Sequence, residues 1–172
     1  MFRLIGGLFR ESTKINSFQQ WVDVVKENKK VIILTTKYVM FIAGLLSSAL
    51  KEMGIESKII RKEPVWGYSD LPHIVISPQV FRKLPKNYIA YQVEQLEAST
   101  WFNDEYKRRL EDAIAIFDYS KHNIEFLEKI YLNKRIFFLP ISVNRALCNK
   151  FELSFDKKEY DVRVILPKYE CM

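Results

Sequence analysis

The stretch "KVIILTTKYVMFIAGLLSSALKEMGIESKII", Lys30–Ile60, decides the fold class of this chain. Its continuous apolar and β-branched start, Lys30–Thr36, is typical of a strand that is covered on both faces. An apolar helix follows through Leu50, and Gly54 is well suited to end it, after which Ile55–Ile60 is a second short strand. Strand, helix and strand in this order predict a β-α-β unit with parallel strands and a right-handed crossover.

The same alternation extends to both sides of this unit. Apolar residues at helical spacing predict a helix over Phe18–Asn28. Asn103 is suited to cap a second helix over "NDEYKRRLEDAIAIF", Asn103–Phe117, and Ser120 a third over "KHNIEFLEKIY", Lys121–Tyr131. Further strands are predicted at His73–Pro78, at Asn87–Gln95, near the end of "AIAIFDYS" and at Arg135–Ile141. The sequence therefore predicts an α/β fold, with a Rossmann-like, doubly wound and mostly parallel sheet of five or six strands.

Length and composition fit one globular domain. The chain has 172 residues, of which 48% are apolar and 28% charged, and its formal net charge is +6. The basic runs Lys26–Lys30 and Lys107–Arg109 are interpreted as solvated helix faces, and the alternative is a surface that meets an anionic membrane or a phosphorylated substrate. The longest apolar stretch, Tyr38–Gly54, is shorter than the ~20 residues that span a bilayer, so a buried helix and a cytoplasmic protein are expected.

Several catalytic classes lack their sequence signatures here. The first strand is followed by "LTTKYVMFIAG" and not by GxGxxG, and neither a P-loop nor a GxSxG motif is present. Thr35 and Thr36 stand where a phosphorylated receiver domain needs carboxylates. The two cysteines and two histidines show no metal-ligand spacing, so no metal site is expected.

Polar residues crowd the end of one predicted strand. In "YIAYQVEQLEASTWF", Tyr88–Phe102, an apolar alternation runs into Gln92, Glu94 and Gln95. Ligands of doubly wound sheets sit beyond the carboxyl ends of the strands, so these side chains are candidates for a binding rim. The structural alternative is that they hydrogen-bond the backbone of neighbouring loops.

"YQVEQ" (Tyr91–Gln95), "STWF" (Ser99–Phe102), "FDYSKHNIEFL" (Phe117–Leu127) and "FFLPI" (Phe137–Ile141) together resemble the N-terminal, acceptor-side half of GT-B glycosyltransferases. The resemblance is to bacterial enzymes of surface-polysaccharide assembly and covers roughly residues 30–143. It implies a single GT-B-type half over residues 1–156, followed by residues 157–172 as a linker and the truncated start of a second domain.

The resemblance also implies roles for individual residues. Glu94 would be the base that takes the proton of the acceptor hydroxyl. Substrate-binding residues would follow it in the polar segments quoted above: Tyr91, Gln92, Gln95, Trp101, Tyr119, Ser120 and Asn123. For several of these a structural role is the alternative, since Trp101 can pack against the sheet edge and Ser120 with Asn123 can simply cap a helix.

Partners follow from the same resemblance. The acceptor would be a saccharide or a lipid-linked saccharide, and the nucleotide-sugar donor would bind mainly to the missing domain, supplied by a C-terminal half or a partner subunit. Neither a cofactor nor a nucleic acid is expected. Peripheral contact with the inner face of the membrane is expected.

Trp66 and Tyr68 are interpreted as anchors of the loop Arg61–Pro72, with contact to an acceptor sugar or lipid as the alternative. The alternative for the whole chain is a non-catalytic Rossmann-like module that binds a partner protein.

Overall fold

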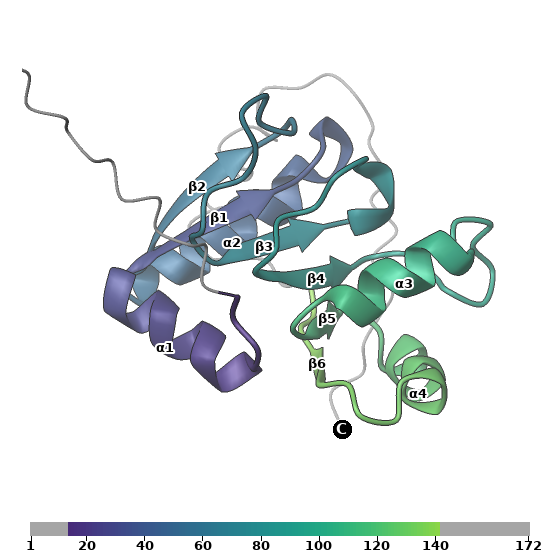
Figure 1. Ribbon diagram of the computed structural model, residues 1–172. Helices are drawn as coiled ribbons and strands as arrows, with labels where there is room; N and C mark the ends of the chain where they lie inside the picture. The colour runs from purple at the N-terminus through teal and green to yellow at the C-terminus, as the bar shows by residue number, and fades with distance from the viewer. Residues whose placement is uncertain (1–13, 142–172) are drawn as a thin grey trace, which may run out of the picture. The chain divides into compact units, whose positions relative to one another are not determined.

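Strands and helices alternate along the part of the chain that the computed structural model describes, residues 14–141 (Figure 1). The strands are β1 (Lys30–Leu34), β2 (Glu56–Ile60), β3 (His73–Ile76), β4 (Tyr88–Gln92), β5 (Ile116–Asp118) and β6 (Ile136–Phe138). The α-helices are α1 (Phe18–Asn28), α2 (Met40–Glu52), α3 (Asp104–Asp112) and α4 (Lys121–Ile130), and two 3₁₀ turns lie at η1 (Lys37–Val39) and η2 (Pro78–Val80).

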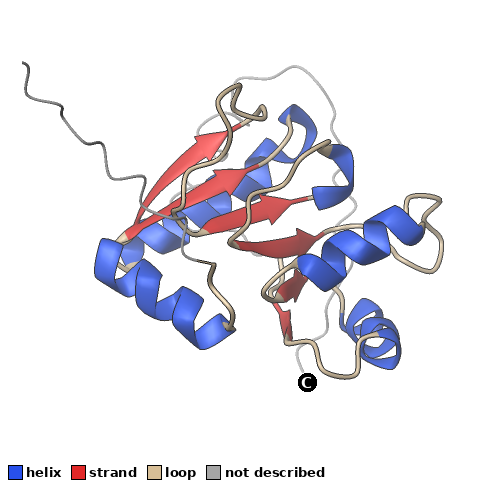
Figure 2. Cartoon of the chain, viewed as in Figure 1, coloured by secondary structure: helices blue, strands red, loops and turns tan. Residues whose placement is uncertain are grey.

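The six strands form one sheet with the order β2-β1-β3-β4-β5-β6, and all five neighbouring pairs are parallel (Figure 2). The predicted doubly wound, Rossmann-like α/β fold is therefore confirmed, and the sheet is parallel throughout. The chain moves outward from β1 to β2, returns past β1 to β3, and then continues outward to β6. Because every strand points the same way, all their carboxyl ends meet at one edge of the sheet, called here the carboxyl edge.

Alternating side chains of each strand serve two separate apolar clusters. On β1, Ile33 packs with buried residues of α1 and α2, whereas Leu34 packs with buried residues of α3 and α4. On β4 the same division separates Ile89 and Tyr91 from Tyr88 and Ala90. Helices on both faces explain why the central strands are nearly continuous apolar runs in the sequence.

The predicted helix ends are present. Asn103 and Ser120 accept hydrogen bonds from the backbone N–H groups of Tyr106 and Asn123, so each caps its helix. Gly54, the residue after the α2 cap Met53, has φ +73°, a conformation that favours glycine. The caps could be predicted from the sequence because they depend only on local residue types.

The predicted strands Lys30–Thr36, His73–Pro78 and Arg135–Ile141 are shorter in the structure, and two further boundaries differ for reasons that the contacts show. Strand β4 ends at Gln92 and not at Gln95, because the Gln92 side chain bonds both the N–H and the carbonyl oxygen of Glu94 and turns the chain. Helix α3 ends at Asp112, since Ala113 is extended with φ −64° and ψ 145° and leads into the buried strand β5. The expected linker at 157–172 lies outside the described residues. Among the helices at 14–141, none combines the length and apolarity needed to cross a membrane.

Lys29 provides a test of the α1 terminus. It is exposed and has φ 50° and ψ 31°, a left-handed conformation that costs a non-glycine residue about 1 kcal/mol. We expect Lys29→Gly to raise the free energy of unfolding by roughly 0.5–1 kcal/mol in urea titrations. The matched control Lys26→Gly also removes one positive charge, but inside the helix, and should lower the free energy of unfolding by about 1 kcal/mol. Equal destabilisation by both variants would contradict the left-handed helix end.

Candidate functional site

A buried carboxylate, that of Asp118, lies at the end of β5 on the carboxyl edge. It accepts hydrogen bonds from the Gln92 side chain at 2.9 Å, from the Asn123 side chain at 3.2 Å and from the Ser120 N–H at 2.7 Å. Gln92 and Asp118 are register partners on β4 and β5, so the parallel pairing itself brings them together. Gln92, Asp118 and Asn123 are all buried, and together they form the network that closes this end of the sheet.

The same network fixes the segment that follows β4. Asn123 donates to the carbonyl oxygen of Glu94 at 2.7 Å and accepts from the N–H of Leu96 at 3.2 Å. Gln92 donates to that same Glu94 carbonyl at 2.8 Å. Side chains from a strand and from a helix therefore satisfy the Glu94 N–H and carbonyl groups and the N–H of the buried Leu96.

The environment of Asp118 alters its acidity. Burial raises the pKa of its carboxyl group from 3.8 to about 6, against the opposing effect of hydrogen bonds from Ser120, Asn123 and Gln92. Burial disfavours the ionised form, and the three donors recover only part of that cost. A titration near pH 6 is thus built into the network.

Glu94 lies at the outer side of this network. Its side chain is half-buried, accepts a hydrogen bond from the Gln79 amide at 3.1 Å, and lines an open hollow of about 420 Å³. The other lining residues are Val93, Gln95, Ala98, Ser99, Thr100 and Tyr119. One carboxylate, one amide and three hydroxyl groups thus line this open hollow.

Two polar atoms beneath this region are buried without a hydrogen-bond partner, Tyr106 Oη and Gln79 Oε1. Burial raises the pKa of the Tyr106 hydroxyl well above its usual value, and the nearby charges of Glu94 and Asp118 raise it further. Buried polar atoms are normally satisfied, so each of these two atoms has capacity for one more hydrogen bond.

The predicted site residues divide into buried and exposed groups. Gln92 and Asn123 are buried within the network, and the buried Tyr91 donates from its hydroxyl to the Leu139 carbonyl at 2.8 Å. Ser120 caps α4 and is half-buried. Glu94, Gln95 and Tyr119 line the hollow. Trp101 is exposed in the segment beyond Thr100 and is not among the lining residues.

Sequence reasoning missed two members of this group, Asp118 and Gln79. Asp118 stands at the last position of a strand and two residues before a helix cap, a position that could have identified it as a candidate. Gln79 lies in the short turn η2 after β3, and no local pattern separates it from an ordinary surface glutamine.

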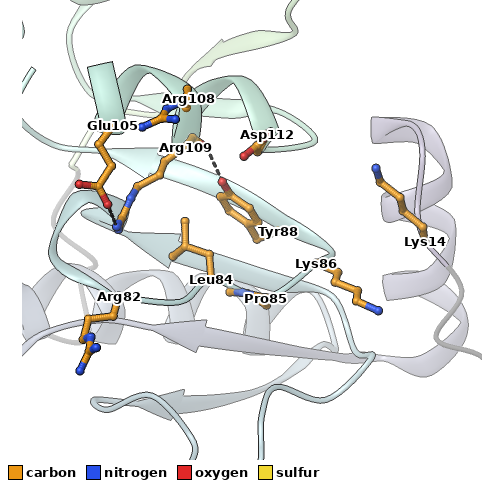
Figure 3. Close-up of a pocket in the computed structure, with 10 residues that line it drawn as sticks. All are labelled: Lys14, Arg82, Leu84, Pro85, Lys86, Tyr88, Glu105, Arg108, Arg109 and Asp112. Carbon is orange, nitrogen blue, oxygen red and sulfur yellow. Dashed lines mark hydrogen bonds and ion pairs between the residues drawn. The ribbon is translucent and has the colours of Figure 1, made fainter. Parts of the chain in front are cut away.

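A second open pocket, of about 710 Å³, lies between α3 and the segment before β4 (Figure 3). Five basic and two acidic side chains line it, together with Leu84, Pro85 and Tyr88. One of its cations, Arg109, is already bonded to the Pro78 carbonyl at 2.7 Å and to Glu105. Figure 3 shows Arg82 and Lys86 pointing away from Tyr88 at the centre, so the charges do not converge on one ligand position.

Among residues 14–141, no group of three or more His, Cys, Asp or Glu side chains is arranged to hold a metal ion. No protein-family model matches the chain, and it matches neither a curated protein nor a solved structure. The case for a function therefore rests on the geometry of the carboxyl edge.

The raised pKa of Asp118 gives a pH-dependent test. Between pH 3.8 and about 6 the folded protein binds this proton more strongly than the unfolded chain, so the contribution to stability falls as the pH rises. When the pH is lowered from 7 to 5, we expect the free energy of unfolding of the wild type to rise by roughly 1 kcal/mol relative to that of Asp118→Asn, as measured by urea unfolding.

The comparison cancels groups that titrate in both proteins, among them the buried His73, whose pKa burial lowers to about 4. Asp23→Asn, which removes one exposed carboxylate on α1, is the control and should follow the wild type. A wild type and an Asp118→Asn variant with the same pH dependence would contradict the raised pKa.

Proposed function

We propose that the chain binds a saccharide, free or lipid-linked, in the hollow at Glu94 and acts as the acceptor-side half of a glycosyltransferase. The observation that carries the proposal is the Glu94 carboxylate, half-buried on the carboxyl edge of a parallel sheet and surrounded by hydroxyl and amide groups. Sugars present closely spaced hydroxyl groups, and such groups pair well with carboxylate, amide and hydroxyl side chains. Carboxyl edges of doubly wound sheets are the usual position of ligands in this architecture.

The buried network supports a catalytic role for Glu94 by fixing its backbone. Gln92 and Asn123 both hold the Glu94 carbonyl oxygen, so they position the residue without reaching the hollow themselves. A general base must stay within hydrogen-bond reach of the proton that it removes. Glu94 would accept the proton of an acceptor hydroxyl while that oxygen attacks the anomeric carbon of the donor sugar, and the bond from this carbon to the nucleotide's phosphate oxygen would break, so that the nucleotide leaves with the electron pair.

The remaining parts of the reaction belong to other groups. A nucleotide sugar would be the donor and would bind mainly to a second domain or a partner subunit, and no further cofactor is needed for this transfer. The chain would work on the cytoplasmic side of the membrane, where nucleotide sugars are the activated donors that this chemistry requires.

A titration with a panel of mono- and oligosaccharides, followed by backbone amide NMR, tests the binding step. We expect shifts at residues 93–100 and 119, and loss of these shifts in Glu94→Ala, because the carboxylate provides the strongest acceptor in the hollow. Glu97→Ala is the matched control, since Glu97 is exposed three residues away and pairs with His122 at 2.8 Å outside the hollow. Shifts elsewhere, or no shift with any saccharide, would reject the site.

Glu94→Gln separates catalysis from binding once a donor-binding half is added in trans. The amide keeps the shape and much of the hydrogen bonding but cannot take a proton, so transfer should fall by roughly 10²–10⁴-fold with little change in saccharide affinity. Full transfer by Glu94→Gln would remove Glu94 from the mechanism. Saccharide-independent binding of a partner protein, unchanged in Glu94→Ala, would favour the alternative of a non-catalytic binding module.

A further inference from the structure

The turn after β2 presents two apolar side chains to solvent. The N–H of Gly67 bonds the carbonyl oxygen of Pro64 at 3.1 Å, and Gly67 has φ +88°, so residues 64–67 form a tight turn with Val65 and Trp66 at its tip. Val65 is 90% exposed and Trp66 is 99% exposed. A tryptophan with its whole side chain in water is uncommon and marks an interaction surface when other apolar groups lie near it.

Both sides of this turn are held by the body of the domain. The Glu63 carboxylate accepts the N–H groups of Arg82 and Lys83, at 2.6 and 3.3 Å. On the other side, Tyr68 donates to the Lys83 carbonyl at 2.9 Å and packs edge-on against His73. The tip is therefore displayed from a fixed base.

Two more aromatic side chains are exposed at the neighbouring strand end. Tyr38, in η1, is 80% exposed, and Phe41, in the first turn of α2, is 61% exposed. The segments that carry the two pairs are adjacent, because Thr36 and Lys37 line the same open hollow of about 740 Å³ as Ile60, Arg61 and Lys62. Tyr38 and Phe41 thus follow a segment that lies beside residues 60–62, which lead from β2 into the turn that carries Val65 and Trp66.

The charges around these residues are basic. Lys37, Arg61 and Lys62 are exposed and come from the same two segments. The nearest acidic residue in sequence, Glu63, points its carboxylate to the backbone of residues 82–83 and is only half-exposed. The aromatic–basic patch, defined as Lys37, Tyr38, Phe41, Arg61, Lys62, Val65 and Trp66, therefore combines apolar side chains with uncompensated positive charge.

We propose that the aromatic–basic patch binds the surface of an anionic phospholipid bilayer. Tryptophan and tyrosine prefer the interface between headgroups and acyl chains, and lysine and arginine beside them pair with anionic headgroups. Protein interfaces are depleted in lysine, so a patch that joins exposed aromatic residues to Lys37 and Lys62 fits a membrane surface better than a protein partner. The contact is superficial, with the turn tip and the start of α2 entering the headgroup region.

This inference does not depend on the proposed saccharide site. The patch lies over β1 and β2, whereas the Glu94 hollow lies beside β4 and β5, and the two share no residue. Vesicle binding is measured without saccharide and saccharide binding without vesicles, so either proposal can fail while the other stands.

The test uses the full chain and vesicles of phosphatidylcholine with or without one third phosphatidylglycerol, scored by co-sedimentation. We expect binding to the anionic vesicles, little binding to neutral ones, and a decrease as salt is raised. A blue shift of tryptophan emission should accompany binding and should persist in Trp101→Phe but vanish in Trp66→Phe, since Trp21 is buried and does not change.

Matched charge variants separate the patch from the overall positive charge. The variant with Lys37, Arg61 and Lys62 all changed to Gln should lose roughly 100-fold in partition coefficient, because each basic residue near an anionic surface contributes about fivefold. The control changes Lys26, Arg108 and Lys129 to Gln, which removes the same charge from the C-terminal halves of α1, α3 and α4, and should lose tenfold or less.

Four results would overturn the proposal. One is absence of binding to anionic vesicles at low salt, and another is an equal loss in the two triple variants. The third is a dimer in sedimentation experiments that Trp66→Ser dissociates, because the patch would then be a protein interface. Retained vesicle binding in the double variant Val65→Ser, Trp66→Ser would likewise exclude the turn tip as the contact.

Discussion

One buried carboxylate, that of Asp118, holds the carboxyl edge of the sheet together. An ionised group in a buried position costs several kcal/mol unless hydrogen-bond donors surround it. Here Gln92 on β4, Asn123 on α4 and the N–H of Ser120, between β5 and α4, each donate one hydrogen bond. Their geometry sets the path of residues 93–96, and that path leaves the Glu94 side chain as the acidic group facing the hollow.

Periodicity predicted the strands and helices because each element satisfies its own local requirements. β1 and β3 are apolar on both faces, and the helices α3 and α4 begin at side chains that cap them. The candidate site was less predictable, because Gln92 and Glu94 look alike in the sequence and differ in the structure. Gln92 shares the face of β4 that carries Tyr88 and Ala90, and its register partner and hydrogen-bond acceptor is Asp118 on β5, 26 residues away. No local pattern contains that pairing.

The loop between β2 and β3 shows that the burial of apolar loop residues is also hard to predict from the sequence. Trp66 and Tyr68 are two aromatic residues in one loop, and the sequence favoured an anchoring role for both. The structure confirms this for Tyr68, which contacts His73 and Lys83, whereas Trp66 is exposed and anchors nothing. The tight turn ending at Gly67 separates them, and it turns the chain between the two side chains. Exposure of Trp66 is thus a consequence of backbone geometry.

Parallel strands place the Glu94 hollow and the aromatic–basic patch at the same edge of one sheet. The hollow lies beside β4 and β5 and the patch over β1 and β2, which are three strand spacings apart, or about 15 Å along the edge. A bilayer bound at the patch would therefore lie within the reach of a short saccharide whose lipid anchor stays in the membrane. The two proposals are independent in their evidence, yet together they favour a lipid-linked saccharide over a free one, because only the lipid-linked ligand would gain from both contacts.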